Sequence, residues 1–201
     1  MSAHRKDEYL QAARLDIQPN RARIELDLTP GMAVADAVLA EIDTDRNGSI
    51  SQEEARTYVA HVLTGITVDV DGFPLAIQAG DSTFPTVEAT RNGEGTIRID
   101  LLASMPHLGT GPHHLNYRNT HRRDISVYLA NALVPESDQV AVTGQDRDSD
   151  QHDLSVAYVL RADVPGGFDW RPITASAAVL LGLAFAISRL PRRRQTASPS
   201  A

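Results

Sequence analysis

Apolar and polar residues alternate with a period of two through much of this chain. Between residues 22 and 28, for example, Ile24, Leu26 and Leu28 alternate with charged neighbours. Successive side chains of a β-strand point to opposite faces, so this period predicts strands with one buried face. A chain with many such short segments is expected to fold as an antiparallel β-sandwich.

The expected strands extend to residue 161. They cover residues 10–17, 22–28, 66–70, 75–79, the surroundings of Val87, and residues 96–102, 115–118, 125–134, 140–143 and 154–161. The first two should form a hairpin around Pro19-Asn20. Asp71-Gly72 predicts a second tight turn, before residues 75–79. The sequence therefore predicts a mainly β, Ig-like domain over residues 7–163.

One segment, residues 32–64, departs from this alternation. Val34, Val38 and Ile42 recur at helical spacing before a polar stretch, and the same spacing resumes from Ala55 onward. These periods predict two amphipathic helices. We therefore expect a helix-loop-helix inserted into the sandwich.

The polar stretch between the helices, residues 43–54, carries oxygen atoms at positions that suit a metal ion. It reads Asp-Thr-Asp-Arg-Asn-Gly-Ser-Ile-Ser-Gln-Glu-Glu. Gly48 stands where the chain must turn sharply, in a conformation that costs other residues more than glycine. Oxygen ligands in this number are those that Ca²⁺ prefers. The candidate ligands are Asp43, Asp45, Asn47, the backbone carbonyl of Ser49, Ser51 through a water molecule, and a bidentate Glu54.

This loop resembles the calcium loop of the EF-hand family at each position that coordination constrains. The resemblance implies Ca²⁺ as the cofactor and an inward-pointing Ile50. With three carboxylates in a single loop, we expect a dissociation constant of about 10⁻⁴ to 10⁻³ M, as in extracellular modules. Ser51 and Glu54 also form a capping-box pattern, which would suit the second helix without any metal.

A second acidic run, residues 146–150, imitates only the opening of such a loop. Gln151 stands where glycine is required, and Ala157 stands where the closing glutamate would be. We interpret this run as a solvated turn. EF-hands usually work in pairs, so Ile50 needs another partner or the loop stays mobile. Because strands flank the helix pair on both sides, we expect Ile50 to pack on this chain's own apolar surface. The sandwich would then hold the two helices at a fixed separation.

Charge and cysteine content exclude several classes of function. The formal net charge is −7, and the body of the chain is more acidic because Arg189, Arg192, Arg193 and Arg194 lie near the C-terminus. An acidic body disfavours nucleic acid as a partner. The absence of cysteine excludes disulfides, thiolate metal sites and a cysteine nucleophile.

The C-terminal segment predicts a single membrane span. Residues 172–188 carry no charge, and a helix over residues 173–190 would be about 27 Å long, close to the hydrocarbon thickness of a bilayer. Trp170 precedes this helix, and the arginines that follow it should stay cytoplasmic. A buried core helix is the alternative. This interpretation divides the end of the chain into a linker (164–172), a transmembrane helix (173–190) and a basic cytoplasmic tail (191–201).

The same rule places the domain outside the membrane, in the periplasm or at the cell exterior. The first eight residues contain no apolar stretch, so we expect the natural start, with a signal peptide, to lie upstream. The alternative is a tail-anchored protein whose domain is cytoplasmic.

The body of the chain, from about residue 7 to 161, is similar to the extracytoplasmic N-terminal β-domain of bacterial nickel/cobalt-transporter-like and hydrogenase/urease-accessory membrane proteins. Residues 66–72 (ITVDVDG), 115–119 (LNYRN) and 125–129 (ISVYL) carry this resemblance. It implies an extracytoplasmic, membrane-anchored domain. Those proteins continue into several membrane helices, so transport itself is not implied.

These features support two hypotheses of function and disfavour a third. The first is a binding module with structural calcium and an unidentified protein partner. The second is an accessory or sensing protein for nickel or cobalt transport, in which the histidines bind metal; these are His107, His113, His114 and His121. An enzyme is not expected, since the sequence lacks a nucleophile elbow, phosphate loop, dinucleotide fingerprint and zinc-protease helix.

Overall fold

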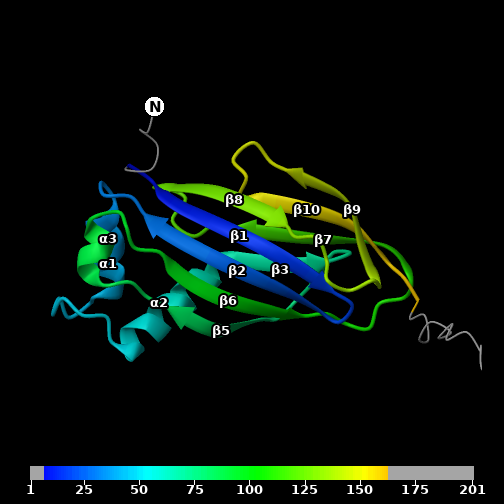
Figure 1. The fold of residues 1–201 in the computed structure, drawn as a ribbon, viewed down its shortest axis with the longest axis horizontal. Coiled ribbons are helices and arrows are strands. Elements are labelled where there is room, and N and C mark those ends of the chain that lie inside the picture. The colour runs from blue at the N-terminus through cyan, green and yellow to red at the C-terminus, as the bar shows by residue number, and fades with distance from the viewer. Residues whose placement is uncertain (1–6, 163–201) are drawn as a thin grey trace, which may run out of the picture. The chain divides into compact units, whose positions relative to one another are not determined.

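A computed structural model describes residues 7–162, which form two five-stranded β-sheets packed face to face (Figure 1). The first sheet has the strand order β5-β6-β2-β1-β8, and the second has the order β4-β3-β7-β10-β9. The elements are β1 (Tyr9–Gln18), β2 (Arg21–Pro30), α1 (Ala35–Ile42), α2 (Gln52–Thr64), β3 (Ile66–Val70), β4 (Phe73–Pro74), β5 (Ile77–Thr83), α3 (Val87–Arg91), β6 (Ile97–Ser104), β7 (Gly111–Asn119), β8 (Ser126–Ala132), β9 (Val140–Arg147) and β10 (Asp153–Leu160).

The alternation of the sequence is confirmed by the burial of the strands. In β1 every second side chain is buried, and Gln18 pairs with Arg21 to close the expected hairpin with β2. The Asp71-Gly72 turn is also confirmed. Asp71 and Gly72 have φ values of 52° and 81°, the positive values that a tight hairpin turn requires at its two central residues.

Two expectations about the strands are wrong. Residues around Val87 form the short helix α3, because Thr86 caps a helical turn by accepting a hydrogen bond from the Ala89 N–H at 3.1 Å. The sandwich is also not wholly antiparallel. Strand β8 runs parallel to β1, with Leu10 opposite Val127. Alternation marks each strand but not its partner, so the sequence did not indicate this pairing.

The core lies between the two sheets. It combines inward-facing residues of both sheets with residues of the two longer helices. Burial of each large aliphatic side chain contributes about 1.5–3 kcal/mol. The largest fully buried side chains are Tyr9, Tyr58, Tyr117, Tyr158, Leu15, Ile17, Ile24, Leu26, Leu28, Ile42, Ile97 and Ile99.

The helix-loop-helix is one of the connections between the two sheets. It leaves the first sheet at β2 and enters the second sheet at β3 (Figure 1). Val38 and Ile42 of α1, and Tyr58 and Val62 of α2, belong to the same core cluster as the strands. Both predicted helices are therefore present, and the sandwich core holds each of them.

The outer edge of β8 is covered by side chains of β9, from the other sheet. Gln145 accepts a hydrogen bond from the Ala132 N–H at 2.9 Å and donates one to the Ala132 carbonyl at 3.2 Å. Arg147 Nε donates to the Ala130 carbonyl at 2.6 Å. Two polar side chains thus take the positions that the backbone of a further strand would occupy.

The predicted linker (164–172), transmembrane helix (173–190) and cytoplasmic tail (191–201) lie outside the described residues. Within residues 7–162, no helix combines the length and the apolar character needed to cross a bilayer.

Candidate metal centre

The candidate loop runs from the C-terminal end of α1 into the first turn of α2. Asp43 directly follows α1 and donates its N–H to the Leu39 carbonyl at 2.8 Å. Glu54 lies in the first turn of α2, after Ser51 at the N-cap. Only 6% of Asp43 and 9% of Glu54 is exposed. The first and last expected ligands are therefore held by regular structure and largely shielded from solvent.

Three carboxylates converge at the loop. Oxygen atoms of Asp43, Asp45 and Glu54 all lie within 4.8 Å of one another. Among the described residues, no lysine, arginine or histidine forms an ion pair with any of the three. Carboxylates at this separation repel one another, so a cation between them would be stabilised.

Backbone N–H groups of the loop orient these oxygens. Gly48 donates to Asp43 Oδ2 and Asn47 to Asp43 Oδ1, both at 3.0 Å. Ser49 donates to Asn47 Oδ1 at 2.8 Å. Gly48 has a φ of 82° and an ideal Cβ on it would meet no atom within 4 Å, so the glycine is needed for its backbone conformation alone.

Glu54 uses its two oxygens differently. Oε2 accepts the Ser51 N–H at 2.9 Å and the Ser51 hydroxyl at 2.8 Å, while Ser51 Oγ accepts the Glu54 N–H, which confirms the capping box. Oε1 reaches across the loop and accepts the Thr44 N–H at 2.8 Å. The hydrogen bonds from Ser51 lower the pKa of Glu54 to about 2. A capping box needs only the first of these oxygens, whereas a bidentate ligand needs both near the ion.

The predicted ligands are thus brought together to different degrees. The Asp43, Asp45 and Glu54 carboxylates converge, and Asn47 Nδ2 donates to Asp45 Oδ2 at 2.7 Å. The Ser51 side chain serves as the helix cap. The converging ligand atoms are all oxygens, so this set suits a hard cation such as Ca²⁺.

A second cluster appears where the sequence indicated only a solvated turn. Ligating atoms of Asp148, Asp150 and His152, in the turn between β9 and β10, also lie within 4.8 Å of one another. Two of the three members already contact each other, since Asp148 Oδ2 lies 2.5 Å from His152 Nδ1, and Asp148 Oδ1 accepts the Asp153 N–H. The three residues stand at every second position of the sequence, and this spacing could have indicated the cluster.

The four histidines considered for a transition metal are not gathered into a site. His113 Nδ1 lies 2.7 Å from Asp71 Oδ2, and its Nε2 lies 2.8 Å from the Gly109 carbonyl. His121 is buried, whereas His107 and His114 are exposed. Within the described part of the chain, no group of three ligating side chains contains any of them.

Sequence reasoning missed a buried polar network behind the helix pair. The hydroxyls of Tyr9 and Tyr58 lie 2.6 Å apart, and the Tyr58 hydroxyl lies 3.3 Å from His121 Nε2. Burial, followed by the charges of His61 and Arg122, lowers the pKa of His121 to about 4. The three residues are far apart in the sequence, so no local pattern indicated that they would meet.

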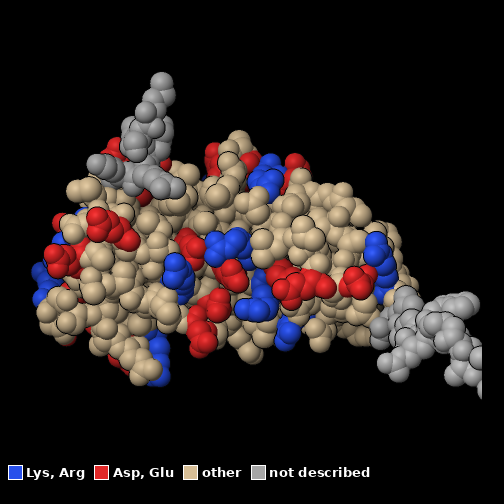
Figure 2. Space-filling model, viewed as in Figure 1, with Lys and Arg blue, Asp and Glu red and all other residues tan. Residues whose placement is uncertain are grey.

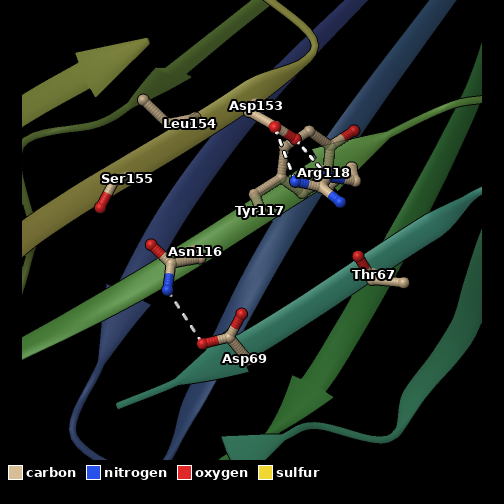
Figure 3. A pocket seen from close by; sticks show the side chains of 8 residues that line it. All are labelled: Thr67, Asp69, Asn116, Tyr117, Arg118, Asp153, Leu154 and Ser155. Atoms are coloured by element: carbon tan, nitrogen blue, oxygen red, sulfur yellow. Dashed lines mark hydrogen bonds and ion pairs between the residues drawn. The ribbon is translucent and has the colours of Figure 1, made fainter. Parts of the chain in front are cut away.

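A polar hollow of about 410 Å³ lies on the second sheet, and Figure 3 shows the side chains that line it. Asn116 points to Asp69, and Arg118 points to Asp153. These pairs are hydrogen-bonded across neighbouring strands, at 2.9 Å for the first and at 2.6 and 2.8 Å for the second. The charged groups in this hollow therefore already have partners.

Acidic and basic side chains are mixed on the face of the molecule that Figure 2 shows. On the first sheet, Arg14 pairs with both Glu25 and Asp27, at 3.1 and 3.0 Å. Neighbouring opposite charges of this kind largely cancel one another at a distance.

Comparisons of the chain with models of known protein families, with curated proteins and with solved structures found no match.

Proposed function

We propose that residues 43–54 bind a calcium ion, and that the ion fastens the helical connection of an Ig-like binding module for a protein partner. One observation carries this proposal. Three carboxylates, Asp43, Asp45 and Glu54, converge within 4.8 Å without an ion-pair partner among the described residues. The expected ligands are these three side chains, together with Asn47, the Ser49 carbonyl and a water held near Ser51.

The surroundings of the loop favour a structural role for calcium over a sensing role. Ile50, at the centre of the loop, packs against the main core. Tyr58 and Ile42 anchor the two helices in that core as well. Sensor EF-hands open their helices to expose an apolar groove. Here that movement would pull buried residues out of the sandwich, so the ion would tighten the loop without opening the helices.

Calcium titration of the purified protein tests this proposal. Against a dissociation constant of about 0.2 mM, about 5 mM calcium should stabilise the fold by about 2 kcal/mol relative to protein in chelator. Thermal unfolding measures the shift, and an unchanged midpoint would exclude the site. Titration with nickel under the same conditions addresses transition-metal sensing. A larger shift with nickel than with calcium would favour that alternative.

The sequence further supports a single-pass membrane protein whose domain lies outside the cytoplasm. Residues 173–190 supply the apolar segment and the following arginines supply the cytoplasmic anchor. Protease added to intact cells should remove the domain and leave the arginine-rich tail protected. Release of the domain only after lysis would instead place it in the cytoplasm. We propose a non-enzymatic role for this domain.

A further inference from the structure

The turn between β7 and β8 contacts both helices that flank the candidate calcium loop. Thr120 donates its N–H to the Gly65 carbonyl at 2.7 Å, at the C-terminal end of α2. Two residues later, Arg122 forms an ion pair with Glu41 in the last turn of α1. Glu41 stands two residues before Asp43, the first expected ligand. One turn of the sandwich therefore contacts the C-terminal end of α2, which is distant from the loop, and the C-terminal end of α1, which leads into the loop.

The Arg122 side chain is held in place from several directions. It is only 17% exposed, and its Nε and Nη2 donate to the Asp124 carboxylate at 3.0 and 3.1 Å while Nη1 donates to Glu41. Its backbone has a φ of 50°, which is unfavourable for a residue with a Cβ. A conformation of this kind persists only where surrounding contacts impose it. The fixed guanidinium is thus a rigid support for Glu41.

Glu41 depends on that support. Among the described residues, Arg122 is the one group that donates a hydrogen bond to Glu41. The other carboxylate oxygen, Oε2, is buried without a hydrogen-bond partner, and His61 Nε2 lies 3.9 Å from it. Loss of the Arg122 contact would leave this carboxylate partly buried and unpaired, which favours a shift of the end of α1.

We propose that Arg122 is a positioning residue for the calcium loop. By holding Glu41 against the β7–β8 turn, it fixes the last turn of α1 and therefore the place of Asp43 opposite Glu54. This inference rests on the calcium function proposed above. It adds that the affinity of the loop is set in part by a residue 81 positions from Glu41 in the sequence, in the turn between β7 and β8.

Electrostatics and positioning predict opposite results when Arg122 is replaced by methionine. Arg122→Met removes a positive charge from the neighbourhood of the loop, and the change in charge alone would strengthen the binding of a cation. Loss of positioning would weaken it. Methionine keeps an unbranched apolar chain in the place of the arginine stem, so the packing around it changes little.

The test measures calcium affinity by calorimetry on the full-length protein, with the thermal midpoint in chelator as the check on folding. We expect Arg122→Met to weaken affinity about tenfold, the lower end of the range for groups that orient metal ligands. Arg123→Met is the matched control, because it removes the same positive charge from an exposed position of the same turn and leaves the contacts of Arg122 with Glu41 and Asp124 in place. Its affinity should stay within about twofold of the wild type.

A double mutant separates positioning from charge. If Arg122 acts through Glu41, the variant with both Arg122→Met and Glu41→Gln should bind calcium about as weakly as the weaker single variant. Unchanged or tighter binding by Arg122→Met would overturn the inference. Should that variant fail to fold, Arg122→Lys keeps the charge but loses the planar fork, and wild-type affinity in it would overturn the inference equally.

Absence of the calcium site and absence of the positioning role would give different experimental results. If the wild-type protein binds no calcium, the proposed function is wrong and the role of Arg122 falls with it. If the wild type binds and the Arg122 variants bind equally well, the calcium site stands and only the positioning role is wrong.

Discussion

The phenolic oxygens of Tyr9 and Tyr58 lie 2.6 Å apart and join the first strand of the sandwich to its second helix. Both side chains are almost completely buried, at 0% and 1% exposure. The Tyr58 hydroxyl also faces His121 Nε2 at 3.3 Å. The helix pair is therefore fastened to the sheets by a buried polar network as well as by apolar packing. Such a network stabilises one arrangement of the helices because its buried groups cannot replace these hydrogen bonds with hydrogen bonds to water.

The losses of stability caused by removing each hydroxyl of this pair should not be additive, because either hydroxyl left alone is buried without its partner. We expect Tyr58→Phe to lower the free energy of unfolding by about 1–3 kcal/mol, because the Tyr9 hydroxyl is left buried without that partner. The double variant, Tyr9→Phe with Tyr58→Phe, should lose clearly less than the sum of the two single losses. Urea unfolding of the calcium-free protein measures all three. Losses that simply add would mean that the two hydroxyls are not coupled.

Glu54→Gln should separate calcium binding from helix capping. Glutamine can still accept the hydrogen bonds from Ser51 but loses the acceptor of the Thr44 N–H, so the calcium-free protein should be somewhat less stable than the wild type while α2 keeps its cap. The bidentate carboxylate is lost, so most of the calcium-dependent gain of about 2 kcal/mol should disappear. Asp148→Asn, in the other acidic turn, is the matched control and should retain the full gain. The reverse pattern would place the ion between β9 and β10.

His121 makes the stability of the protein depend on pH. Its pKa is about 4 in the folded protein and about 6.5 in an unfolded chain, so the unfolded state takes up a proton first. Stability should therefore fall as the pH drops from about 6.5 to about 4, by up to about 3 kcal/mol, and then level off with respect to this group. His113 acts in another window, because Asp71 raises its pKa and its contribution is lost only as the pH rises.

Urea unfolding at intervals between about pH 6.5 and pH 4 tests this dependence, and a proton NMR titration follows His121 directly. His61→Gln serves as the comparison. The charge of His61 is the second cause of the lowered pKa of His121, so this variant should raise that pKa and shrink the loss. If His121 titrated near pH 6.5 in the folded protein, the interpretation of its burial would be wrong.

Two glycines should respond to alanine for different reasons. At Gly48 the added methyl group meets no atom within 4 Å, so Gly48→Ala should cost only about 1–2 kcal/mol for the left-handed backbone. At Gly65 it would meet the His121 backbone nitrogen at 2.8 Å, so the β7–β8 turn must move. Gly65→Ala should cost up to about 3 kcal/mol and loosen the turn that holds Arg122. Equal stability of the two variants would contradict this distinction.

The sequence predicted the strands well where each strand has one clearly buried face. Alternation alone located β1, β2 and β6, because every second residue of each lies in the core. It did not locate α3, since a single apolar residue such as Val87 carries no period and the cap at Thr86 decided the local structure. Nor did it indicate the parallel pairing of β8 with β1, because alternation carries no information about neighbours.

The convergence of the loop's carboxylates could be predicted because they lie in one short run of the sequence. Asp43 and Glu54 are eleven residues apart, and the resemblance to an EF-hand loop indicated that they would converge. The network around His121 could not be predicted, because Tyr9, Tyr58 and His121 come from distant parts of the chain. The same holds for Glu41 and Arg122, whose contact arises only when the two sheets pack.

The hydrogen bonds of Gln145 and Arg147 to β8 limit how this strand can pair with another copy of the protein. An uncovered terminal strand offers its free N–H and carbonyl groups to a strand of another molecule, which begins fibrous or dimeric assembly. Here the Ala132 amide and carbonyl are already engaged by an amide side chain that mimics a peptide group. A strand of another molecule could pair with this part of β8 only by displacing the two side chains.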